Sequence, residues 1–185
     1  MRDSSNLRSL DITALCREAE AIEGRLALTD LSRLGESLFG ASDADAEAAW
    51  SAHASQKQVA GGEPERWLHL AAQAEVTLQC QRCLQAVRRP LAVARRFRFV
   101  RSEQEATRLD EEIEDDVLVL PPRLDLLELL EDELILALPI VARHDGACPQ
   151  PLPLPAAVVE EAAPNPFAKL AALRRAPPRE DPGAK

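Results

Sequence analysis

Aromatic residues are scarce in this sequence: they make up 3% of its 185 residues, and tyrosine is absent. A hydrophobic core therefore has to be built mainly from leucine, valine and alanine. The chain is 46% apolar and 29% charged, which is typical of a globular protein. Its length is that of one domain of ordinary size, with enough residues to bury a core without cross-links.

Long apolar runs are also missing. The first twenty residues contain no continuous apolar segment, which argues against a signal peptide. The longest apolar region, 117–142, contains six charged side chains, which excludes a membrane-spanning helix. The net charge of −9 argues against a surface that coats nucleic acid or an anionic membrane as a whole, although local basic patches remain compatible with it. We therefore expect a soluble cytoplasmic protein without membrane contact.

The motifs of common active sites are absent as well. The sequence has no phosphate-binding glycine loop, no His-Glu-x-x-His and no Gly-x-Ser-x-Gly, and its three histidines are far apart in the chain. Acidic residues are plentiful, but Glu128, Glu131, Asp132 and Glu133 are interpreted as the solvated face of a helix. We therefore predict that the protein is not an enzyme.

Apolar residues in the N-terminal part recur at helical spacing. Over residues 9–40 this spacing predicts two helices. A short extended segment at 23–29 would join them, with Thr29 or Asp30 as the N-cap of the second helix. Cys16 falls on the apolar face of the first helix and is predicted to be a buried apolar residue.

The middle of the chain changes to an alternating pattern. Residues 49–101 predict three or four strands that are joined by short turns and are therefore antiparallel. The segment 103–116 holds eight acids and one arginine, and is predicted to be a solvated loop. A helix is then predicted over 125–138, with Asp125 as its N-cap and Glu128 at capping-box spacing.

These patterns predict an α+β fold, in which an antiparallel β-sheet is flanked by helices. We expect a single domain over residues 1–148, followed by a proline-rich tail over 149–185 that contains nine of the fourteen prolines. Within the tail, 166–175 has a proline at its start, apolar residues at helical spacing and arginines at its end. This stretch predicts a short helix that docks onto a protein partner or onto the sheet of the domain itself.

The Cys-x-x-Cys at Cys80 and Cys83 is the first candidate site. Two thiolates at this spacing can bind one tetrahedral zinc ion, but a structural site needs four ligands. His144 and Cys148 are close together in sequence and can supply the other two, which makes a Cys3His set. Two alternatives stay open. One is a redox couple, which the strand on either side of the pair disfavours; the other is a pair of reduced thiols without a ligand.

A basic stretch is the second candidate site. If 91–100 is a strand, Arg96 and Arg98 share one face while Phe97 and Phe99 share the other. Such an arginine face could follow the phosphates of RNA. The alternative is that the acidic segment that follows simply neutralises it. The candidate nucleic-acid contacts are Arg88, Arg89, Arg95, Arg96, Arg98 and Arg101.

Four segments occur together in a particular order: the Cys-x-x-Cys within 78–84, the acidic leucine-rich segment 125–139 that ends in Leu-Pro, the histidine and cysteine within 144–148, and the Asn-Pro-Phe-Ala within 164–170. In order and spacing they resemble the YceD family of large ribosomal RNA subunit accumulation proteins. Some members have a second Cys-x-x-Cys after the Leu-Pro helix. Here Pro151 stands at the third position after Cys148, and His144 takes the place of the missing thiol.

The resemblance implies a bacterial cytoplasmic protein that supports the synthesis, processing or stability of 23S ribosomal RNA. Its partner would be large-subunit ribosomal RNA or a pre-ribosomal particle, with a further protein partner bound through 165–175. The resemblance supplies no catalytic residue. The competing functions are an acidic protein-protein adaptor that does not touch RNA, which the net charge favours, and a thiol redox protein.

Overall fold

A computed structural model describes residues 4–40 and 46–152, together with Phe167 and Leu170. The chain divides into a compact unit, Met1–Pro151, and a second unit, Leu152–Lys185. Most of the predicted proline-rich tail lies outside the described residues, and so do all but two residues of the helix predicted at 166–175. Within the described part of the chain, no helix is long and apolar enough to cross a membrane.

Five strands form one sheet, whose order follows the sequence from β1 to β5. The first four are antiparallel, whereas β5 pairs with β4 in parallel. Flanking helices complete an α+β fold and confirm the predicted class, but the sheet is mixed rather than purely antiparallel. The strands are β1 (Ala21–Ala27), β2 (Glu47–Lys57), β3 (Glu65–Gln79), β4 (Ala86–Val100) and β5 (Asp116–Val119).

The acidic segment is the reason for the parallel strand. It was predicted to be a loop over 103–116, which is wrong, because its first half forms α4 (Glu103–Asp110). The Ser102 hydroxyl accepts the N–H of Glu105 at 3.3 Å and caps the helix, and the acids of the first turn interact favourably with the helix dipole. Leu109 is buried. The helix acts as a crossover that returns the chain to the same end of β4, so β5 runs parallel to β4.

The N-terminal part holds a strand that the helical pattern concealed. The helices α1 (Ser4–Leu7), α2 (Ile12–Glu18) and α3 (Ser32–Ser37) surround β1, with a short 3-10 turn, η1 (Leu28–Asp30), before α3. The predicted extended link is therefore an edge strand of the sheet. Opposite Trp50 on β2 it carries Gly24, where a Cβ atom would come within 3.1 Å of the indole ring. Cys16 is 1% exposed, as predicted.

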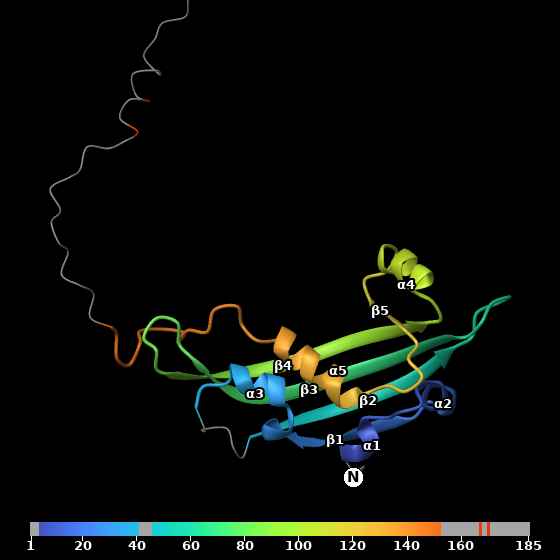
Figure 1. Ribbon diagram of the computed structural model, residues 1–185, viewed down its shortest axis with the longest axis horizontal. Helices are drawn as coiled ribbons and strands as arrows, with labels where there is room; N and C mark the ends of the chain where they lie inside the picture. The colour runs from blue at the N-terminus through green and yellow to red at the C-terminus, as the bar shows by residue number, and fades with distance from the viewer. Residues whose placement is uncertain (1–3, 41–45, 153–166, 168–169, 171–185) are drawn as a thin grey trace, which may run out of the picture. The chain divides into compact units, whose positions relative to one another are not determined.

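The helix α5 (Leu126–Leu136) covers one face of the sheet together with α3 (Figure 1). Its predicted N-cap is confirmed, because the Asp125 carboxylate accepts the N–H of Glu128 at 2.9 Å. Leu130 and Leu134 of its apolar stripe are fully buried. Successive side chains of β4 point to opposite faces of the sheet. Phe97 and Phe99 therefore enter the core while Arg96 points away, as the period of two predicts.

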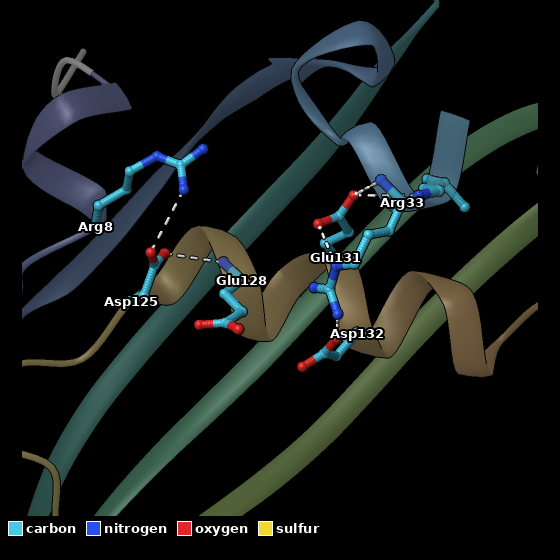
Figure 2. A network of polar contacts seen from close by, with 7 residues as sticks. Arg8, Arg33, Asp125, Glu128, Glu131 and Asp132 are labelled. Atoms are coloured by element: carbon cyan, nitrogen blue, oxygen red, sulfur yellow. Dashed lines mark hydrogen bonds and ion pairs between the residues drawn. The ribbon is translucent and has the colours of Figure 1, made fainter. Parts of the chain in front are cut away.

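Glu131 is not on a solvated face of α5, contrary to the prediction, because only 7% of it is exposed. Its carboxylate accepts the backbone N–H groups of Arg33 at 2.7 Å and Leu34 at 3.1 Å, in the first turn of α3 (Figure 2). The Arg33 side chain also donates to it, from Nε at 3.1 Å. The N-cap position of α3 is Leu31, whose side chain makes no cap hydrogen bond. The prediction that Thr29 or Asp30 caps this helix is therefore wrong, and Glu131 supplies the cap from another helix.

Glu133 is buried to the same degree, with 7% exposed, which also contradicts the predicted solvated face. It pairs with Arg95 of β4 through Nε at 3.2 Å. Burial raises the pKa of Glu133, and the positive charge of Arg95 opposes this rise only in part. The acids of α5 thus include two that tie the helix to its neighbours, to α3 and to β4.

Candidate metal centre

The Cys-x-x-Cys lies at the tip of the hairpin between β3 and β4. The N–H of Cys80 donates to the carbonyl of Gln85 at 2.9 Å, and the N–H of Leu84 donates to the carbonyl of Cys80 at 2.8 Å. Leu84 has a φ of 61°, in the left-handed region that favours glycine. This tight turn directs both thiols inward, where Cys80 is 0% and Cys83 1% exposed.

The segment that follows α5 brings the other two residues to the hairpin. The N–H of Gln81 donates to the carbonyl of Ala142 at 2.8 Å, which holds the segment against the hairpin tip. The Arg82 side chain reaches back from the hairpin, donating from Nε to Cys148 Sγ at 2.9 Å and from Nη2 to the carbonyl of Gly146. As a result, residues more than sixty positions apart meet.

The four predicted ligands converge on one point. Their ligand atoms all lie within 4.8 Å of one another. Cys80 Sγ and Cys148 Sγ are 3.9 Å apart, and Cys83 Sγ is 3.6 Å from His144 Nδ1. Zinc bound to thiolates at about 2.3 Å in a tetrahedron places neighbouring sulfur atoms about 3.8 Å apart. The set Cys80, Cys83, His144 and Cys148 therefore has the donors and the spacing that a tetrahedral zinc ion requires.

The orientation of the histidine also suits a metal ligand. His144 Nε2 is 3.1 Å from the carbonyl oxygen of Ala86, at the start of β4. Since a carbonyl can only accept, this contact places the ring proton on Nε2 and leaves the lone pair on Nδ1, which faces Cys83. A backbone acceptor that orients the ligating imidazole in this way is a common feature of metal sites.

The electrostatics of the cluster favour a thiolate at Cys80. Burial by itself raises the pKa of Cys80, but hydrogen bonds from the backbone of Arg82, His144 and Cys83 lower it, and the pKa falls to about 5. Burial raises the pKa of Cys83, and its thiol neighbours add to this rise. A thiolate that is fully buried is poorly placed to attack a disulfide but well placed to bind a cation.

The predicted nucleic-acid contacts lie along β4 and at its ends, and each of the six arginines is paired with a carboxylate. One partner, Asp115, comes from the acidic segment that follows β4; the others come from β3, its preceding turn, α5 and the segment after α5. The pairs are Arg88 with Glu75, Arg89 with Asp145, Arg95 with Glu133, Arg96 with Asp115, Arg98 with Glu65, and Arg101 with Glu63.

Two arginines beside the candidate metal ligands were not among the predicted site residues. Arg82 lies inside the Cys-x-x-Cys and hydrogen-bonds to the third cysteine. Arg143 precedes the predicted histidine ligand and lines a hollow together with Arg82 and Arg89. Their position next to the candidate ligands in the sequence could have identified them as site residues, since a metal that fixes a turn also fixes the residues next to its ligands.

Comparison with known proteins identifies one family. Its model, described as "Large ribosomal RNA subunit accumulation protein YceD", matches residues 68–174, which is more than half of the chain. The matched segment begins within β3 and includes the hairpin, all four predicted ligands and α5. No solved structure matches the chain.

Proposed function

Because the chain belongs to the YceD family, we propose that it is a ribosome biogenesis factor that supports the synthesis, processing or stability of 23S ribosomal RNA in the cytoplasm. The family match is the observation that carries this proposal. The partner would be large-subunit ribosomal RNA or a pre-ribosomal particle. The family description names the accumulation of an RNA rather than a reaction, which supports a role in binding rather than in catalysis.

A zinc ion held by Cys80, Cys83, His144 and Cys148 is part of the proposal. The convergence of the four ligand atoms and the orientation of His144 support it. Four protein ligands fill a tetrahedral site and leave no position for a substrate, as in structural zinc sites. The ion would fasten the segment that follows α5 to the hairpin tip, and would thereby stabilise a surface rather than carry out chemistry.

Direct RNA contact by the arginines of β4 also remains a proposal. Arg96 and Arg98 lie over Trp67, with their guanidinium carbons 5.4 and 5.8 Å from the ring centroid. Each would have to exchange its carboxylate for a phosphate when RNA binds. The double variant Arg96→Glu/Arg98→Glu should then weaken RNA binding and flatten its dependence on salt. Unchanged affinity and an unchanged salt slope would remove these two residues from the interface.

One observation favours an adaptor role as a second candidate. The end of α5 and the segment after it expose large apolar side chains, since Leu136 is 70%, Ile140 102% and Val141 49% exposed. Exposed apolar residues that lie close together are typical of protein-binding surfaces. A protein partner recovered from cells after nuclease treatment, and lost in Ile140→Asp, would support an adaptor that acts without RNA.

The test of the main proposal is depletion of the protein in its host, followed by quantification of mature 23S and 16S ribosomal RNA. We expect a selective fall in 23S RNA that is restored by the wild-type gene. Complementation with Cys80→Ser/Cys83→Ser then asks whether the metal ligands are needed. An unchanged ratio of 23S to 16S RNA would contradict the proposed function.

A further inference from the structure

A hollow lies beside the candidate metal centre, and three of its seven lining residues are arginines. Its volume is about 500 Å³. The hairpin contributes Arg82, the start of β4 contributes Arg89, and the segment after α5 contributes Arg143. The lining contains three arginines and one acid, so the hollow is positively charged in a protein whose net charge is −9. The hollow is also lined by Pro139, Val141 and Asp145.

Arg143 differs from the arginines of β4. Among the residues that the structure describes it has no carboxylate partner, and it is exposed. Arg89 does have a partner, Asp145, at 2.8 Å. The side chain of Asp145 is 90% exposed, whereas that of Arg89 is 20% exposed. An anion can therefore reach Arg143 without displacing a carboxylate, and can reach Arg89 by displacing an exposed acid.

The candidate metal ligands hold Arg143 and Arg82 in place. Arg143 immediately precedes His144, and Arg82 lies between the two cysteines of the hairpin while it donates to Cys148 Sγ. The carbonyl of Gly146 takes a second hydrogen bond from Arg82. Any ion that fixes the four ligands also fixes the spacing between the hairpin and the segment that carries Arg143.

We propose that this hollow binds phosphate groups of RNA through Arg143 and Arg89, and that the metal centre keeps the segment that carries Arg143 in position against the hairpin. Guanidinium groups bind phosphate oxygens with two parallel hydrogen bonds, which suits an RNA backbone. The apolar wall formed by Pro139 and Val141 leaves room for a ribose or a base beside the phosphate. The proposal deepens the proposed function and rests on it, since it assumes that RNA is the partner.

The test uses the purified, zinc-loaded full chain and a fluorescein-labelled single-stranded RNA of about 16 nucleotides, a length that one small domain can cover. Binding is measured by anisotropy at several salt concentrations. Arg143→Ala should weaken binding about tenfold, since hydrogen bonds to charged groups contribute this much. The salt slope should fall by about 0.7 for each phosphate contact that is lost. Zinc content should stay at the wild-type level.

Two further variants make the test specific. Arg25→Ala is the matched control, because Arg25 of β1 is an exposed arginine that pairs with Glu47 at 3.3 Å, and it is neither a candidate RNA contact nor among the residues that line the hollow. Its RNA affinity should equal that of the wild type. Asp145→Asn removes the acid that competes for Arg89 and should tighten binding.

The possible outcomes separate this proposal from the proposed function. If Arg143→Ala binds RNA with wild-type affinity while Arg96→Glu/Arg98→Glu loses affinity, phosphate binding in the hollow is contradicted. The proposed ribosomal role is then unaffected. Absence of RNA binding by the wild-type protein would also contradict phosphate binding in the hollow, whereas the depletion experiment would still decide the ribosomal role. Weakened binding in Arg143→Ala and wild-type binding in Arg25→Ala would support phosphate binding in the hollow.

Discussion

Two buried polar clusters join distant parts of this chain, and they differ in how their polar atoms are satisfied. Around Glu131, a carboxylate on α5 meets two backbone N–H groups and a guanidinium group from α3, so that acceptors face donors (Figure 2). Around Cys80, three thiols and an imidazole nitrogen lie within 4.8 Å of one another, so that atoms with lone pairs face one another. The first cluster is matched internally, whereas the second brings together four atoms that can each bind a metal ion.

The difference gives a physical criterion for separating structure from function. Buried polar groups in folded proteins are matched by partners, and a set that is matched internally needs no explanation beyond stability. Lone pairs that converge without donors between them repel, unless a cation or protons occupy the space. Arg82 donates to the cluster from one side, through Cys148, and does not fill its centre. By this criterion the Glu131 cluster is architectural, and the cysteine cluster is a candidate metal site.

The largest expected effect comes from removing the proposed ion. Cys80→Ser/Cys83→Ser should purify without zinc, whereas the wild type should carry one ion per chain. If zinc is present at about 1,000 times its dissociation constant, it stabilises the folded state by about 4 kcal/mol, and the variant should lose this contribution. Metal analysis and urea unfolding, each with and without chelator, measure both effects.

The matched control for this variant is Cys16→Ser. Cys16 is a buried thiol outside the cluster, so its replacement can destabilise the core but should leave the zinc content and the response to chelator unchanged. A wild-type protein that holds no metal, and whose unfolding transition does not move when zinc is added, would place the cysteine cluster in the same class as the Glu131 cluster.

An intermediate effect is expected at Glu131. Glu131→Ala leaves the N–H groups of Arg33 and Leu34 without an acceptor, and should lower the free energy of unfolding by about 2–3 kcal/mol. Chelator should not change this loss. Asp132→Ala is the control, because Asp132 also pairs with Arg33 but is 45% exposed, and should cost less than about 1 kcal/mol. Equal stability of the two variants would mean that the carboxylate of Glu131 does not cap α3.

The smallest effect is a pH dependence at Glu133. Because burial raises its pKa, folded Glu133 retains its proton at a higher pH than the unfolded chain does. The stability that this provides is complete below the unfolded pKa of about 4.3 and is lost as the pH rises through the folded pKa. Relative to the wild type, Glu133→Gln should therefore gain stability between about pH 4 and pH 7, by less than about 1 kcal/mol. Unfolding of both proteins across this range measures the difference, and a constant difference would contradict the shift.

Local patterns in the sequence were sufficient for much of the fold. The alternation of apolar residues predicts the long strands β2, β3 and β4, and Asp125 with Glu128 predicts the start of α5. The four candidate ligands were also found from sequence, because cysteine and histidine at such spacings are restricted to few kinds of site. These predictions depend on residues a few positions apart, and the geometry of a helix or strand decides their outcome.

The errors arose where the partner of a residue is distant. Glu131 looks like any other exposed acid of α5 until α3 lies beside it, since its partner is 98 positions away. The strands β1 and β5 are too short or too charged for a clear alternation, and they form because an edge of the sheet is available to them. Sequence left open whether the six arginines between Arg88 and Arg101 are free or neutralised, whereas the fold brings a carboxylate to each of them.

The long strands, the start of α5 and the candidate ligands were thus set by local sequence, because propensity and period act over a few residues. Which acids are buried, which arginines are paired and whether four ligands meet were decided by the tertiary structure alone. Those properties depend on distances between segments that only packing establishes. Arg143 illustrates the point: in sequence it is one arginine among many, and in the folded chain it is an exposed arginine without a carboxylate partner among the described residues, beside the candidate metal centre.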